Sequence, residues 1–190
     1  DLEIISKEID RMEAFIRNFL KFAKPAEPTF EIIDPVEVLH EVIQLVKPNL
    51  KKNQIELEFR QVAERYKVSG DSSQLKQVFM NLIINAIEVM PNGGKLIFTI
   101  RPYQNTELAS IENQTRYLSV NIEDFGPGIP EKVMKNLFEP FIKGSVQGVG
   151  LGLSISQNIA SMHRGWIEGI NKPDGQGAIF SVFIPIVAEN

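Results

Sequence analysis

The segment DFGPGIP, residues 124–130, turns the chain sharply after a strand-like run. Residues 117–123 before it alternate apolar and polar side chains, which is the period of a half-buried strand. The run ends in a carboxylate, Asp124, followed by Gly126 and Gly128. Glycine tolerates positive φ and has no side chain, so the backbone can lie close against a flat ligand. A fixed carboxylate accepts hydrogen bonds and therefore suits a ligand with an amino group, such as adenine. Alone, this motif is weak, because acidic residues are common in glycine turns.

Three further motifs accompany this segment. Upstream, NLIINA at residues 81–86 places Asn81 and Asn85 one turn apart on an apolar helix. Downstream lie LFEPF at residues 137–141 and GVGLGLS at residues 148–154. In order and spacing, the four motifs resemble the N box, first glycine box, F box and second glycine box of bacterial sensor histidine kinases. The resemblance is to the catalytic, ATP-binding domain of that family and covers essentially the whole chain.

Composition limits the class of protein. The chain has 190 residues, 43% of them hydrophobic and 23% charged, which is typical of a soluble globular protein with one domain and an appendage. A formal net charge of -4 argues against a nucleic-acid binder. With no cysteine, a disulfide framework and a thiolate metal site are excluded. No bilayer-spanning run or signal peptide is evident, so we expect a cytoplasmic location, although the parent protein could be membrane-anchored.

The N-terminal residues predict one long helix. Its apolar residues recur with heptad spacing, which is the pattern of a helix packed lengthwise on other helices. They are Leu2, Ile5, Ile9, Met12, Ile16, Phe19 and Ala23. An amphipathic helix on the domain's own core is the alternative. Pro25 ends the pattern, so we place a boundary there. The resemblance implies that residues 1–25 are the C-terminal helix of a dimerisation and phosphoacceptor bundle, and that residues 26–190 are the catalytic ATP-binding domain.

The remaining sequence predicts an α/β fold. Alternation and turn signals predict strands at 29–33, 55–59, 66–68, 95–101, 117–123, 165–170 and 178–184. Helices are expected after the capping residues Asp34 and Asp71, at 151–162 and, for a turn or two, at 130–136. We expect Pro48 to kink the first of these helices or to end its regular part. The resemblance implies a two-layer α/β sandwich of the Bergerat type, with a mixed sheet and helices on one face.

The resemblance also implies how ATP and Mg²⁺ are held. Magnesium takes hard oxygen ligands, so Asn85 would supply one oxygen to an ion that the phosphates also ligate. Glycines at the start of a helix leave N–H groups free for phosphate. Residues 138–147 would form a lid, with Lys143 as its cation. The implied catalytic residues are Asn81, Asn85 and Lys143. The implied nucleotide contacts are Asn85, Asp124, Gly126, Gly128, Ile129, Phe138, Phe141, Lys143, Gly148, Val149, Gly150, Leu151, Gly152 and Leu153.

The implied reaction is transfer of the γ-phosphoryl group of ATP to a histidine of the bundle, for onward signalling to a response-regulator receiver domain. The parent protein would be a homodimer. Neither His40 nor His163 lies in the family's acceptor context, so we expect both to be structural or surface residues and this chain to be unable to phosphorylate itself. Glu88 stands where the family often has a basic residue, and Ala178 where it often has threonine.

Two other classes remain open. A hydrolytic ATPase of the same superfold carries a glutamate base at the first position of the asparagine box, whereas this chain has Asn81, which cannot take a proton. That residue favours a kinase. A nucleotide-binding interaction module without chemistry is the third possibility.

Overall fold

The computed structural model describes residue 9 and residues 26–61, 65–104, 116–142, 150–173 and 175–187. Ile9 is helical and exposed. The rest of the helix expected over residues 1–25 lies outside the described residues, so the predicted domain boundary is not tested.

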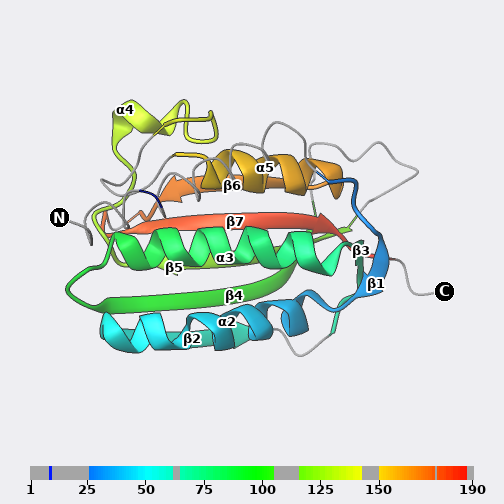
Figure 1. Cartoon of the computed structure of the whole chain (residues 1–190), viewed down its shortest axis with the longest axis horizontal. Coiled ribbons are helices and arrows are strands. Elements are labelled where there is room, and N and C mark those ends of the chain that lie inside the picture. Colours follow the sequence, from blue (N-terminus) through cyan, green and yellow to red (C-terminus); the bar gives the residue numbers. More distant parts are fainter. Residues whose placement is uncertain are drawn as a thin grey trace.

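A five-stranded mixed sheet forms one layer of the fold (Figure 1). Its strand order is β2-β4-β5-β7-β6, in which β2 and β4 are parallel and the other neighbours are antiparallel. The strands are β2 (Ile55–Gln61), β4 (Gly94–Gln104), β5 (Arg116–Asp124), β6 (Trp166–Asn171) and β7 (Ala178–Pro185). A separate two-stranded sheet pairs β1 (Glu31–Ile33) with β3 (Val68–Gly70). The small strands begin two residues later than the sequence pattern predicts.

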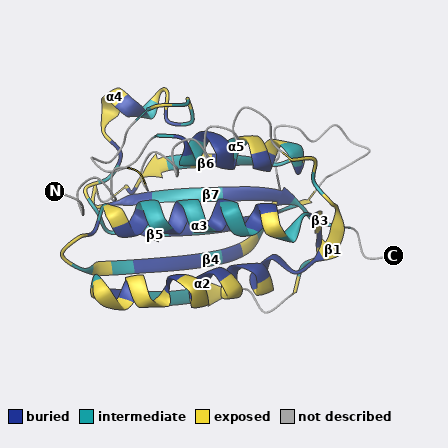
Figure 2. Ribbon diagram, in the orientation of Figure 1, coloured by how far each residue is buried: buried dark blue, intermediate teal, exposed yellow. Residues whose placement is uncertain are grey.

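Among the described elements, the long helices cover one face of the large sheet (Figure 1). They are α2 (Pro35–Lys52), α3 (Ser72–Glu88) and α5 (Gly152–Met162), and a short α4 (Glu131–Met134) lies beside them. The core fills the space between the helices and the sheet, and the sheet-facing sides of α2 and α3 are buried (Figure 2). The two-layer α/β sandwich with a mixed sheet and helices on one face is therefore confirmed.

Local side chains explain where the long helices begin. The carboxylate of Asp34 accepts a hydrogen bond from the N–H of Val36 at 3.0 Å, and Asp71 accepts one from the N–H of Gln74 at 3.0 Å. Such bonds satisfy donors that the first helical turn leaves free. Pro48, however, lies inside α2 and does not end it. It occupies the exposed face of the helix, where the hydrogen bond that proline removes can be replaced by water.

Candidate functional site

Asp124 is the last residue of β5 and is only 3% exposed. Its Oδ1 atom accepts hydrogen bonds from the N–H of Gly126 at 2.9 Å and from the N–H of Ala178 at 3.3 Å. Burial raises the pKa of the Asp124 carboxyl, and these two donors and the charge of Lys172 oppose only part of that rise. Both backbone donors use the same oxygen, so neither occupies Oδ2.

The glycine turn after Asp124 packs tightly on both sides. A Cβ at Gly126 would lie 2.9 Å from a methyl group of Val89, the residue after α3. Gly128 has φ +80°, and a Cβ there would lie 2.8 Å from Oδ1 of Asn171. Both glycines are therefore required by the protein's own packing. The turn lies against the C-terminal end of α3, which is the end that carries Asn85.

The two asparagines of α3 have different surroundings. The amide of Asn81 donates to the carbonyl of Gly152 and to the hydroxyl of Ser156, each at 3.1 Å. It therefore joins α3 to the start of α5. The partly exposed side chain of Asn85 makes no hydrogen bond to any described residue. An amide oxygen in this condition fits a hard cation such as Mg²⁺.

The second glycine motif and the F box meet through the backbone. The N–H of Phe141 donates to the carbonyl of Gly150 at 2.8 Å. Phe141 itself has φ +66° and is 51% exposed, an unusual conformation for a bulky residue. Phe138 and Leu153 pack with buried Ile129 in a small apolar cluster. This cluster joins the first glycine motif to the F box and to the second glycine motif. Leu151 is in the main core.

Three predicted site residues, Lys143, Gly148 and Val149, lie outside the described residues, as does half of the expected lid, residues 143–147. Within the described part of the chain, no group of three or more His, Cys, Asp or Glu side chains could hold a metal ion. A Mg²⁺ ion at Asn85 would therefore need most of its ligands from the nucleotide and water. The described residues also contain no helix long and apolar enough to cross a membrane.

The two histidines have structural surroundings. His163 is 2% exposed, and its Nε2 accepts a hydrogen bond from the N–H of Asp71 at 2.9 Å. Its Nδ1 lies 2.8 Å from the carbonyl of Ile159, so Nδ1 carries the proton of a neutral ring. His40 is exposed, with its ring centroid 4.8 Å from that of Phe59.

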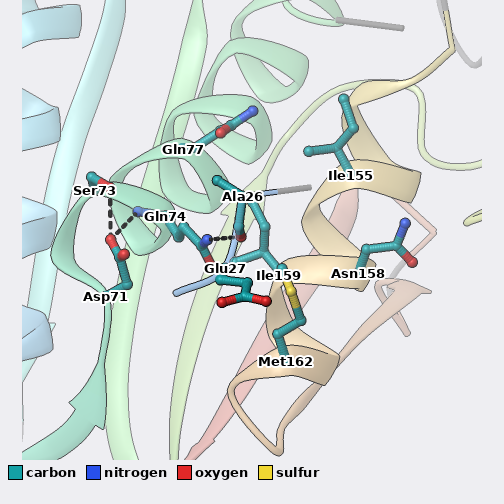
Figure 3. Close-up of a pocket in the computed structure, with 10 residues that line it drawn as sticks. All are labelled: Ala26, Glu27, Asp71, Ser73, Gln74, Gln77, Ile155, Asn158, Ile159 and Met162. Atoms are coloured by element: carbon teal, nitrogen blue, oxygen red, sulfur yellow. Dashed lines mark hydrogen bonds between the residues drawn. The ribbon is translucent and has the colours of Figure 1, made fainter. Parts of the chain in front are cut away.

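A pocket of about 170 Å³ lies at the opposite end of α3 (Figure 3). It is bounded by the segment around Ala26, the start of α3 and the C-terminal half of α5. The amide of Gln74 donates to the carbonyl of Ala26 at 2.9 Å and so anchors the entering chain. The pocket contains none of the predicted site residues.

Asn171 and Lys172, where β6 passes into the loop toward β7, also contact the Asp124 turn. Neither residue is singled out by the sequence, which predicts only a turn there. Asn171 contacts a residue 42 positions away, so no local pattern reveals the pairing.

Residues 70–188 match the sequence profile of the family described as histidine kinase-, DNA gyrase B- and HSP90-like ATPase. The chain belongs to this family.

Among curated relatives, sporulation kinase E of Bacillus subtilis (strain 168) is 30% identical over 183 residues, which are 96% of this chain and 23% of the relative. Sporulation kinase C of the same organism is 33% identical, over 99% of this chain and 41% of the relative. The chain thus spans less than half the length of these relatives.

Solved structures of histidine kinases share the fold. The nucleotide-free catalytic domain of histidine kinase ThkA is 31% identical, with a TM-score of 0.69 over 83% of this chain and 97% of that chain. ThkA in complex with the response regulator protein TrrA is 29% identical, with a TM-score of 0.76 over 97% of this chain and 50% of that chain.

Proposed function

We propose that this chain is the catalytic part of a sensor histidine kinase, which binds ATP with Mg²⁺ and transfers the γ-phosphoryl group to a histidine. The observation that carries the proposal is the Asp124 carboxylate. It is buried at a strand end, its Oδ1 is held by two backbone donors, and neither donor uses Oδ2. That oxygen suits the amino group of adenine and would reject the carbonyl oxygen of guanine.

Asn85 and the glycines before α5 would serve the phosphates. The side-chain oxygen of Asn85 would ligate Mg²⁺, which neutralises phosphate charge when bound. Backbone N–H groups at the start of α5 would face the phosphates. Asn81 would act by holding Gly152 in place, because its amide is bonded to that carbonyl. Roles for Lys143, Gly148 and Val149 remain predictions from the sequence.

In the proposed reaction, the imidazole nitrogen attacks the γ-phosphorus, a nitrogen–phosphorus bond forms, the bond to the β,γ-bridging oxygen breaks, and ADP leaves. The acceptor would lie on a bundle helix that precedes residues 1–25, with residues 26–190 as the catalytic domain. An aspartate of a response-regulator receiver domain would then take the phosphoryl group. The solved ThkA–TrrA complex supports a partner of this kind. The use of ATP favours a cytoplasmic location. The parent protein would be a homodimer.

A hydrolytic ATPase is the second candidate, since the family includes such enzymes. It needs a base to activate water. Asn81 occupies the position of that base, and its amide already donates to Gly152 and Ser156. This bonding favours the kinase.

The test combines this chain with a separately prepared bundle that carries an acceptor histidine, and uses ATP labelled on the γ-phosphate. A kinase should label the bundle, and the label should be acid-labile and base-stable, as a phosphohistidine is. Replacing the acceptor histidine with glutamine is the control and should abolish the label. Rapid ATP turnover without the bundle, lost in Asn85→Ala, would establish the hydrolase instead.

A further inference from the structure

We propose that Asn171 and Lys172 are positioning residues, which hold the glycine turn and the Asp124 carboxylate in the geometry that selects adenine. The proposal rests on the proposed function, since it names further residues that set the specificity of the same site. Asn171 is the last residue of β6, and Lys172 is the next residue, at the start of the loop toward β7.

Asn171 binds the turn through both ends of its amide. Its Oδ1 accepts a hydrogen bond from the N–H of Ile129 at 2.6 Å, and its Nδ2 donates to the carbonyl of Ile129 at 2.9 Å. The side chain therefore satisfies both backbone groups of one residue, as a neighbouring strand would. β6 is the edge strand of the sheet, so no further strand supplies these bonds among the described elements.

The same residue links Ile129 to Asp124 through the sheet. Asn171 is paired in register with Ala178, whose N–H donates to Oδ1 of Asp124. Asn171 thus fixes Ile129 at one end of the glycine turn. Its strand neighbour Ala178 holds Asp124 at the other end. A change in Asn171 should consequently alter how the turn is placed relative to the carboxylate.

Lys172 contacts the residues on either side of Asp124. Its ammonium lies 2.9 Å from a carboxylate oxygen of Glu123 and 3.3 Å from the ring centroid of Phe125. The residue is 8% exposed, and a buried ammonium is costly unless it is compensated. These contacts compensate it and orient Phe125, the first residue of the turn. Its positive charge also favours the ionised form of Asp124, which burial disfavours.

The experiment measures ATP and GTP binding with Mg²⁺ by calorimetry, together with amide hydrogen exchange at Ile129, in the full chain. For Asn171→Ala we expect roughly tenfold weaker ATP binding, a smaller ATP-to-GTP preference and faster exchange at Ile129. Lys172→Met should also weaken ATP binding by roughly tenfold, whereas Lys172→Arg, which keeps the charge, should restore most of it. Exposed Asn49→Ala and Lys135→Met are matched controls and should behave as wild type.

The outcomes separate this proposal from the proposed function. If the wild type binds ATP and both Asn171→Ala and Lys172→Met bind it equally well with the same ATP-to-GTP preference, the positioning role is wrong and the kinase assignment stands. If the wild type does not bind ATP, the proposed function fails and the adenine role fails with it. If Asn171→Ala folds poorly, Asn171→Ser is the second variant. A smaller preference of this variant for ATP over GTP, with an unchanged unfolding midpoint, supports the proposal.

Discussion

Asp124 illustrates a conflict between stability and binding at a single residue. In the proposed function the Asp124 carboxylate accepts a hydrogen bond from the nucleotide, yet the protein buries that carboxylate almost completely. Burial raises its pKa, which means that the folded protein disfavours the ionised form. Two backbone donors and the nearby charge of Lys172 offset part of this cost. Under the proposed function, this residue would favour ligand binding at some expense to the stability of the fold.

Asp124→Asn should weaken ATP binding at least about tenfold, or about 1.4 kcal/mol. The amide would present a donor where the adenine amino group needs an acceptor. Calorimetry with ATP and with GTP checks this, and the preference for ATP should shrink. Unchanged ATP affinity in a folded variant would show that Asp124 does not contact adenine.

The same variant should not destabilise the nucleotide-free protein. The folded-state pKa of Asp124 is raised, so the folded protein keeps this proton to a higher pH than the unfolded chain does. The free energy of unfolding therefore falls as pH rises from the unfolded pKa to the folded pKa. A neutral asparagine avoids that loss, so its free energy of unfolding at pH 7 should equal or exceed that of wild type. Urea unfolding at pH 7 measures the difference. A marked loss of stability would mean that the charge contributes to the fold.

Asn85→Ala should remove the Mg²⁺ dependence of nucleotide binding and leave the stability of the nucleotide-free protein nearly intact. Its partly exposed side chain makes no hydrogen bond within the described part of the chain, so little is lost in the absence of ligand. Titration of ATP with and without Mg²⁺ checks the first expectation, and thermal unfolding checks the second. Asn49→Ala, on the exposed face of α2, is the control. A variant that responds to Mg²⁺ as wild type does would exclude Asn85 as the ligand.

At the scale of elements, α3 connects two ends of the domain. At its start, Asp71 and Gln74 bind the incoming segment through the N–H of Thr29 and the carbonyl of Ala26. Toward its end, Asn81 bonds to α5, and Val89 packs against the glycine turn. The entering segment and the glycine turn thus both contact the same helix.

Asp71→Ala should lower the free energy of unfolding by about 1–2 kcal/mol, because it removes the N-cap of α3 and the partner of Thr29. Although burial opposes the shift, hydrogen bonds from Ser73, Thr29 and Gln74 lower the pKa of Asp71 to about 2. A folded pKa below the unfolded value gives stability that is present above about pH 4 and is lost as pH falls toward 2. Asp71→Asn keeps a good cap but cannot titrate, so its unfolding free energy should vary less over that interval. Identical pH profiles for wild type and Asp71→Asn would contradict this account.

At the scale of the whole molecule, the isolated chain should bind ATP with Mg²⁺ but should neither phosphorylate itself nor hydrolyse ATP quickly. His163 is buried and bonded through both ring nitrogens, and His40 packs beside Phe59. Asn81 provides no base for water. A bound ATP without a positioned nucleophile lacks what phosphoryl transfer requires. Incubation with γ-labelled ATP, followed by gel analysis and a phosphate-release assay, checks both parts. Label on this chain alone would contradict the expectation.

The amino-acid sequence by itself determined the features that depend on near neighbours in the chain. Strand alternation at 117–123 and the caps Asp34 and Asp71 are local, and the structure has the corresponding strand and helix starts. Each of the four motifs is also a short run, and their order along the chain indicated the family that the sequence profile matches. Local rules worked here because a helix cap or a strand period is set by residues a few positions apart. For Pro48, the alternative that it ends the helix is wrong, because α2 continues past it to Lys52.

Only the tertiary structure decided which distant groups meet. Asn81 bonds to Gly152, 71 residues away, and Asn171 bonds to Ile129, 42 residues away. Nothing in the spacing of these residues predicts either contact, because each depends on how the helices and strands pack against one another. The burial of Lys172 has the same origin: a lysine is normally expected in solvent, and only the assembled sheet places Glu123 and Phe125 around it.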